Sequence, residues 1–227
     1  MTNISSDIVF KLGPIDISDS VVITWAGMAV AIILGYIAGK RLKLYPRKWQ
    51  HLLEAAATGV NSAIEEVMER DPWPFFPLIA TIWYMIGASN LTGIVPGLIS
   101  PTRDISTAAA LAAISFLSVH YFGIRYRGFL HYLKHYMEPV WILFPFHIIS
   151  ELSRTVALML RLFGNVMSGE MVAGVLLIVA GFLVPVPFAL LEVVVAILQA
   201  YIFGMLTLIF IAAGVQAIEA EKTKEAA

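Results

Sequence analysis

The feature that most constrains this chain is the stretch of 64 residues from 155 to 218, which holds only three charged side chains. They are Arg161, Glu170 and Glu192. Over the whole chain of 227 residues, 59% of side chains are hydrophobic and 14% are charged, whereas a soluble domain carries about 25% charged residues. Such a chain lacks the polar surface to cover a soluble fold, so we expect the surrounding solvent to be lipid.

The apolar runs predict an all-α integral membrane protein with about five membrane helices and one interfacial amphipathic helix, because about 20 apolar residues cross a bilayer. The expected helices cover residues 20–39, 47–69, 73–95, 104–123, 139–180 and 186–218. An external N-terminal segment, residues 1–19, precedes them, and a charged cytoplasmic tail, residues 219–227, follows. The helix at 47–69 is too polar to span, and its apolar residues recur on one face. This pattern favours a helix on the membrane surface, with a soluble linker helix as the alternative.

The last two expected helices are longer than a membrane requires. About 40 residues at about 1.5 Å each give about 60 Å, against about 30 Å of hydrocarbon. We therefore expect two long, tilted helices. Two ordinary spans with interfacial extensions are the alternative.

Basic residues follow the first and third spans and so predict the orientation. The first group is Lys40, Arg41, Lys43, Arg47 and Lys48, and the second is Arg125, Arg127 and Lys134. Loops rich in Lys and Arg face the cytoplasm. The pattern predicts an external N-terminus and a cytoplasmic C-terminus.

Arg161 is the most informative residue. A charge at the membrane centre costs at least about 2.5–3.5 kcal/mol on insertion scales and usually marks an ion path. Arginine stays protonated at any working pH, so it cannot relay protons itself, but it can attract a carboxylate. A structural salt bridge to Glu170 or Glu192 is the alternative.

The helical face around Arg161 consists of small or polar residues: Ala157, Gly164, Asn165 and Ser168. Small residues let another helix approach closely. We therefore expect this face to receive a partner that carries acidic groups.

Polar residues also occur on both sides of Arg161 along the helices. His147, Glu151 and Arg154 share one helical face toward the inner side, while Glu170 and Glu192 lie toward the outer side, with Gln199 nearer the middle. This order fits two aqueous half-paths that do not connect directly. Ordinary interfacial solvation is the alternative for the inner group.

Other chemistry is not indicated. The chain has no cysteine, which excludes disulfides and thiolate metal sites, and its net charge of −1 favours no nucleic-acid partner. No nucleophile motif or nucleotide-binding loop is present, and no metal-ligand cluster is evident. We expect neither a cofactor nor an enzymatic centre.

Four sequence motifs resemble subunit a of the F-type ATP synthase membrane sector. The most specific is Leu160-Arg161-Leu162-Phe163-Gly164-Asn165, followed by Gly169-Glu170. The others are Leu198-Gln199-Ala200-Tyr201-Ile202-Phe203, Asn90-Leu91-Thr92-Gly93-Ile94-Val95-Pro96-Gly97, and Pro101-Thr102 with Asp104. The resemblance extends from about residue 46 to the C-terminus.

The resemblance implies a stator beside a rotating ring of c subunits. Arg161 would face the ring carboxylates and separate two half-channels that pass protons or sodium ions. Lining residues would be Asn165, Glu170, Glu192 and Gln199 on the outer side, and His147, Ser150 and Glu151 on the inner side. Further implied partners are the peripheral-stalk b subunits, the other synthase subunits and the lipids of a bacterial inner membrane.

A stand-alone secondary transporter or channel is the rival function. Such a protein should show internal repeats and a self-contained site, and the sequence shows neither. A purely structural scaffold would leave the three isolated charges without a role.

Overall fold

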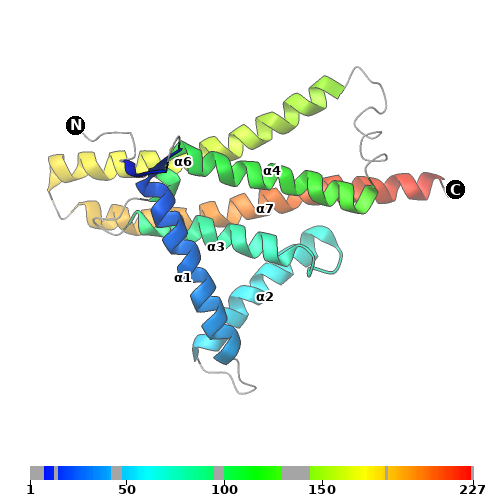
Figure 1. The fold of residues 1–227 in the computed structure, drawn as a ribbon, viewed down its shortest axis with the longest axis horizontal. Coiled ribbons are helices and arrows are strands. Elements are labelled where there is room, and N and C mark those ends of the chain that lie inside the picture. Colours follow the sequence, from blue (N-terminus) through cyan, green and yellow to red (C-terminus); the bar gives the residue numbers. More distant parts are fainter. Residues whose placement is uncertain are drawn as a thin grey trace.

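The structure is a computed structural model that describes residues 8–12, 15–41, 48–94, 100–128, 144–181 and 184–225. In this part of the chain, long helices dominate (Figure 1). They are α1 (Asp19–Arg41), α2 (Lys48–Met68), α3 (Phe76–Thr92), α4 (Ile105–Arg127), α6 (Phe144–Ala180) and α7 (Pro185–Glu225). The short 3-10 helix η1 (Pro101–Arg103) precedes α4. The predicted class, a helical membrane protein with two long final helices, is confirmed.

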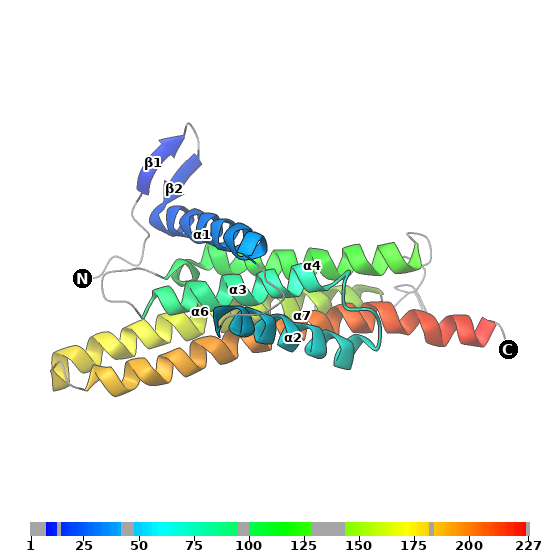
Figure 2. The ribbon, with the colours of Figure 1, turned by 90° about the horizontal axis from the view of Figure 1, so that it is seen from below.

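Two strands, β1 (Ile8–Leu12) and β2 (Ile15–Ser18), form an antiparallel hairpin ahead of α1. Figure 2 shows this hairpin standing off the end of α1, away from the helical body. From the sequence we expected an external segment here and no secondary structure in it. The alternation of apolar and polar residues in Ile15–Ser18 is the signal that was available.

The helices α3, α4, α6 and α7 run side by side, and α1 leaves them at a steep angle (Figures 1 and 2). With 37 and 41 residues, α6 and α7 extend about 56 and 62 Å. α7 continues through Glu225, so part of the expected tail is helical. The first residues of the expected 139–180 helix lie outside the described residues.

Four described helices are long and apolar enough to cross a membrane: α1, α4, α6 and α7. α3 has 17 residues where the sequence suggested a span over 73–95, so its length is about 26 Å. The helix begins late because residues 71–75 form a turn, and Pro77 stands in its first turn. A proline fits there, since the first backbone N–H groups of a helix have no acceptor within it.

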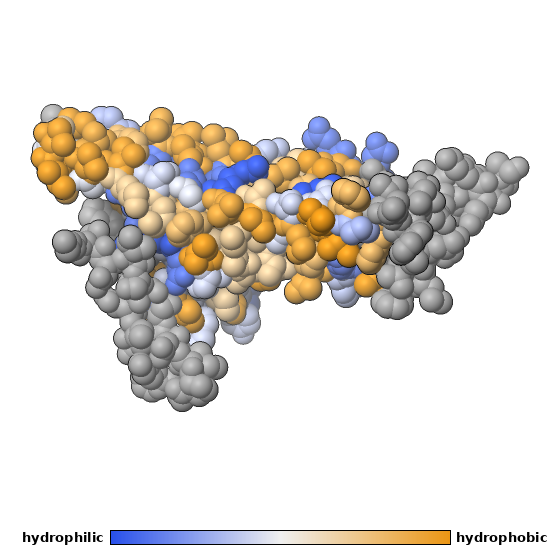
Figure 3. Space-filling model, turned by 90° about the horizontal axis from the view of Figure 1, so that it is seen from above, coloured by the Kyte–Doolittle hydropathy of each residue, from blue (hydrophilic) through white to orange (hydrophobic). Residues whose placement is uncertain are grey.

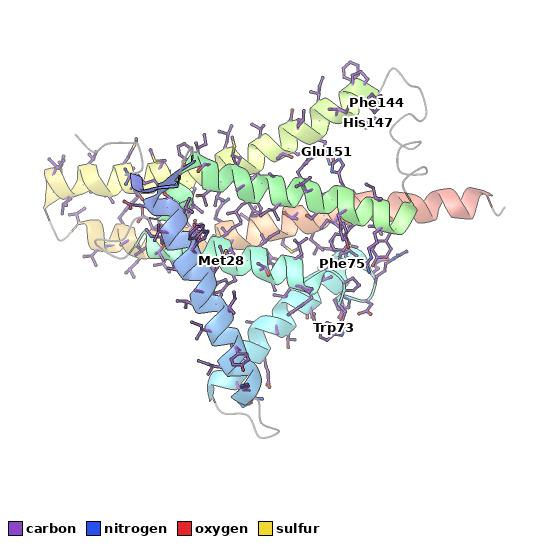
Figure 4. The ribbon with its side chains drawn as sticks, viewed as in Figure 1. Met28, Trp73, Phe75, Phe144, His147 and Glu151 are labelled. Atoms are coloured by element: carbon purple, nitrogen blue, oxygen red, sulfur yellow. The ribbon has the colours of Figure 1, made fainter. Side chains whose placement is uncertain are left out.

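Two buried apolar clusters hold the helices together. The first joins the second half of α2 to the start of α3 and to α4 and α7; its members include Ile64, Phe75, Phe122 and Ile211. Figure 4 shows Phe75 turned into this contact, whereas Trp73 points away from it. α2 therefore packs on the helical body through its second half, while Leu53 in its first half is 53% exposed.

The second cluster joins α3, α4, α6 and α7 around Ile86, Leu158, Leu162 and Phe203. Beside it, Ser115 of α4 and Thr207 of α7 share a buried hydrogen bond of 2.7 Å. Hydrogen bonds between helices are a common source of stability in lipid, where packing brings no hydrophobic gain. α7 is thus anchored to α3 and α4, and α6 joins them mainly through Leu158 and Leu162.

Candidate functional site

Arg161 lies near the middle of α6, on a face that the rest of the chain leaves uncovered. Its side chain is exposed, as are those of Ala157 and Ser168 and the backbone at Gly164, whereas Leu158 and Leu162 on the adjoining face are buried. No atom lies within 4 Å of the position that a side chain at Gly164 would take. The small-residue face is therefore open, as its sequence predicts. Figure 3 shows that apolar side chains cover much of the face in view, including the end formed by α6 and α7.

Arg161 makes no ion pair or hydrogen bond with any residue that the structure describes. The two acidic residues that could have paired with it are engaged elsewhere. Glu170 pairs with Arg103, and Glu192 lies against Gly169. Within the described chain, the alternative of a structural salt bridge between Arg161 and these glutamates is excluded.

A cavity of about 220 Å³, here called the Glu170 cavity, lies toward the C-terminal end of α6. It is bounded by α3, α6 and α7, and its polar lining consists of Asn90, Asn165, Ser168, Glu170 and Glu192. Three residues predicted for the outer side, Asn165, Glu170 and Glu192, are thus brought together. Ser168, predicted only for the packing face, lines the cavity as well.

Gln199 does not line this cavity. It is buried, 6% exposed, about one helical turn beyond the lining residue Ala196. Its Nε2 has no hydrogen-bond partner among the described residues, and the same holds for Nδ2 of Asn90. Buried amide donors are nearly always satisfied, by protein or by water. These two donors mark places where water or a passing ligand can be bound.

The side-chain oxygen of Asn90 is fixed by the segment before α4. Its Oδ1 accepts a hydrogen bond of 2.8 Å from Thr102, and the hydroxyl of Thr102 lies 2.8 Å from that of Ser100. Ser100 in turn donates to the backbone oxygen of Ser89. Gly93 permits this approach, because a Cβ there would lie 2.9 Å from Cβ of Ser100. The segment before α4 is thereby fastened to the end of α3.

A second polar group lies toward the N-terminal end of α6. Nδ1 of His120, on α4, is 3.7 Å from Oε1 of Glu151, and the guanidinium of Arg154 lies 5.1 Å from the ring centre of Phe210. His147 and Ser150 are exposed on the first turns of the helix. Figure 4 shows Phe144, His147 and Glu151 following one another from the tip of α6 toward α4. Glu151 is thus brought to another helix, whereas His147 and Ser150 line no described cavity.

Arg161 stands between these two groups on one continuous helix. Glu151 precedes it by ten residues and Glu170 follows it by nine, so they lie about 15 and 14 Å away along the axis. Leu158 and Leu162, in the apolar cluster beside Arg161, fill the space between the two groups. The sequence missed Arg103, Asn90 and His120 as neighbours of the site. Arg103 is the sole basic residue of the loop between the expected spans 73–95 and 104–123, which is the signal that could have marked it.

These features define an integral membrane protein with ionisable side chains inside its apolar helices and a fixed cation left open to a partner. The sequence family described as ATP synthase A chain matches residues 21–212. "ATP synthase subunit a 2" of Pelobacter propionicus is 46% identical over 215 residues, covering 95% of this chain and 94% of the relative. "ATP synthase subunit a" of Legionella pneumophila strain Corby is 47% identical over 217 residues, covering 95% and 94%. "ATP synthase subunit a 1" of Hahella chejuensis is 47% identical over 213 residues, covering 94% and 91%.

The chain belongs to the ATP synthase subunit a family. It is therefore a stator subunit in the membrane sector of an F-type ATP synthase, and its partners are other subunits of that complex. The resemblance drawn from its motifs is confirmed. A stand-alone transporter is excluded as its function.

Gly169 offers a direct test of the cavity. A Cβ at this position would overlap the carboxylate of Glu192, which is the movable end of a flexible side chain. We therefore expect Gly169→Ala to leave assembly intact, to push the Glu192 carboxylate aside, and to slow ion-driven ATP synthesis in membrane vesicles severalfold. Gly174→Ala is the matched control, since nothing lies within 4 Å of its Cβ position. Equal rates for the two variants would show that the position of Glu192 does not matter.

Proposed function

We propose that this subunit supplies two offset half-channels that pass protons or sodium ions to and from the carboxylates of a rotating c-ring, with Arg161 between them. The observation that carries the proposal is an exposed Arg161 on an apolar helix, without an acidic partner in the described chain. A lone charge in lipid is costly. A ring carboxylate arriving at the open face would offset that cost and be held there in its ionised form.

The Glu170 cavity supports the outer half-channel. Two carboxylates, two amides and a hydroxyl around about 220 Å³ can bind water and a cation, because oxygen ligands suit hard ions. The unpaired amide donor of Gln199 lies about a turn farther along α7, toward the level of Arg161. A water-filled path from the cavity past Asn165 would satisfy this donor and lead to the open face.

The group around Glu151 supports the inner half-channel. His147, Ser150 and Glu151 lie on the first turns of α6, and His120 adds a further titratable side chain from α4. Leu158 and Leu162 separate this group from the outer cavity. An ion therefore could pass between the two groups only by riding on the ring.

We also propose an orientation of the chain in the membrane and a set of partner subunits. Basic residues after α1 and near the end of α4 support an external N-terminus and a cytoplasmic C-terminus. We place the subunit in a bacterial inner membrane, as the family resemblance implies. The peripheral-stalk b subunits are the expected neighbours of the exposed helices that the ring does not cover. The subunit itself is non-catalytic: it conducts ions, and ATP chemistry takes place elsewhere in the complex.

Cysteine cross-linking tests the contact with the ring, since the chain has no cysteine of its own. Gly164→Cys is expected to form a disulfide with a cysteine placed beside the essential carboxylate of a c subunit, because the Gly164 position is open. Gly35→Cys, at an equally open glycine of α1, is the control and should form none. A ring that cross-links to position 35 and not to position 164 would refute the placement of Arg161 against the ring.

A further inference from the structure

Arg103 and Glu170 form an ion pair at the edge of the Glu170 cavity. Nε of Arg103 lies 3.2 Å from Oε2 of Glu170, and the two side chains are 25% and 30% exposed. Partly buried charge pairs interact more strongly than fully exposed ones, because less water screens them. We infer that Arg103 is a positioning residue of the outer half-channel, which holds Glu170 and offsets its charge so that Glu192 is the carboxylate that exchanges the ion. This inference rests on the proposed function of the cavity.

The backbone that carries Arg103 is fixed in place. η1 is fastened to the end of α3 because Thr102 donates to Oδ1 of Asn90 and Ser100 donates to the backbone oxygen of Ser89. Ser100 and Thr102 are fully buried. The guanidinium is therefore directed toward Glu170 by a segment that is itself part of the packed structure.

The neighbouring acid, Asp104, has its own role. Its Oδ1 accepts hydrogen bonds from the backbone N–H and the hydroxyl of Ser106, which caps the start of α4. Arg103 instead reaches across to α6. The ion pair thus links the segment before α4 to the helix that carries Arg161.

The pair divides the two glutamates of the cavity into different roles. Glu170 has its charge offset by Arg103, whereas Glu192 lies against Gly169, where no side chain interposes. Among the described residues, Glu192 has no ion-pair partner. A cation entering the cavity therefore meets one uncompensated carboxylate rather than two, which favours rapid release to the ring over tight binding.

Arg103→Gln tests this division of roles. Removing the cation leaves two uncompensated carboxylates around one small cavity, so the entering ion should be bound more tightly and released more slowly. We expect the maximal rate of ion-driven ATP synthesis to fall about fivefold and the half-saturating external ion concentration to fall by a similar factor, within the range of coupled charge pairs. External pH is varied at fixed sodium, and external sodium at fixed pH, in vesicles that carry the whole synthase.

The second variant is Arg103→Gln combined with Glu170→Gln. Both members of the pair are then neutral, so the excess charge is gone and the maximal rate should recover toward that of Glu170→Gln alone. Arg103→Lys keeps the charge and should lose little. Arg125→Gln, the same change at the other end of α4, should alter neither quantity, because Arg125 contacts Tyr121 of its own helix.

The outcomes separate this inference from the proposed function. A combined variant that is slower than Arg103→Gln, or an unchanged half-saturating concentration in Arg103→Gln, would show that Arg103 merely stabilises its loop and would overturn the inference. If Arg103→Gln fails to assemble, Arg103→Lys is measured instead, beside Glu170→Gln. Arg103→Lys should keep the half-saturating ion concentration of the wild type. A shift of that concentration in Arg103→Lys would overturn the inference. Failure of the half-channel proposal is recognised independently, by a failed cross-link from position 164.

Discussion

Arg161→Ala is expected to abolish coupled ion transport while leaving the synthase assembled. Without the guanidinium, no fixed positive charge would stabilise the ionised form of a ring carboxylate. The carboxylate would therefore keep its ion as it passes the stator. We expect ATP-driven pumping in vesicles to fall at least about a hundredfold, equivalent to about 2.7 kcal/mol, which is close to the cost of a charge at the membrane centre. Assembly should persist because the exposed Arg161 side chain makes no ion pair or hydrogen bond within the described chain.

Two controls accompany this variant. Ile178→Ala removes an 85% exposed apolar side chain from the same helix and should pump normally. Arg161→Lys keeps a positive charge without the planar guanidinium, so its residual pumping measures how much of the role depends on charge alone. Normal pumping by Arg161→Ala, with subunit content unchanged, would sink the proposed mechanism.

The sequence predicted the helices well because lipid imposes one dominant rule. Backbone polar groups must be paired inside the membrane, so apolar runs become helices. α4, α6 and α7 follow this rule closely. α3 does not, since it starts after a turn and its 17 residues pack against other helices rather than meeting lipid alone. The apolar run over residues 73–95 is therefore longer than the helix that it forms.

The cavity was predicted in part for a similar reason. Glu170 and Glu192 stand out because each is charged in an apolar helix, whereas Asn165 was expected on this side only from the family resemblance. Gln199 stands out as a polar residue, yet it lies buried beyond the cavity, because periodicity fixes a face and not the partner helix that covers it. Spacing within one helix placed the polar groups along α6 on either side of Arg161.

Arg103 shows what sequence patterns leave out. It lies 67 residues before Glu170, in the short segment before α4, and only the hydrogen bonds that join η1 to α3 bring the two side chains together. Such a contact depends on the tertiary path of a loop. No local sequence pattern indicates the path of this loop, and a basic residue in a loop is normally expected to face solvent.

The two ends of α6 also differ in a way that bears on mechanism. The group around the Glu170 cavity is enclosed between α3, α6 and α7, whereas His147 and Ser150 are exposed on the first turns of the helix. An enclosed group controls access and binding, while an open one allows exchange with the adjoining water. Rate control by this subunit is therefore expected mainly at the Glu170 cavity, which Glu192 lines.

Glu192→Gln tests that expectation. The substitution keeps the size of the side chain and its fit against Gly169 but removes the one carboxylate of the cavity that has no ion-pair partner among the described residues. Ion-driven ATP synthesis should slow about a hundredfold, the lower end of the range for losing a positioned proton-transfer group, and its dependence on external pH should flatten. Glu170→Gln should cost less, because Glu192 remains to exchange the ion, although Arg103 then loses its acidic partner. Rates of Glu192→Gln that match the wild type at every external pH would remove Glu192 from the path, and with it the assignment of the cavity as the outer half-channel.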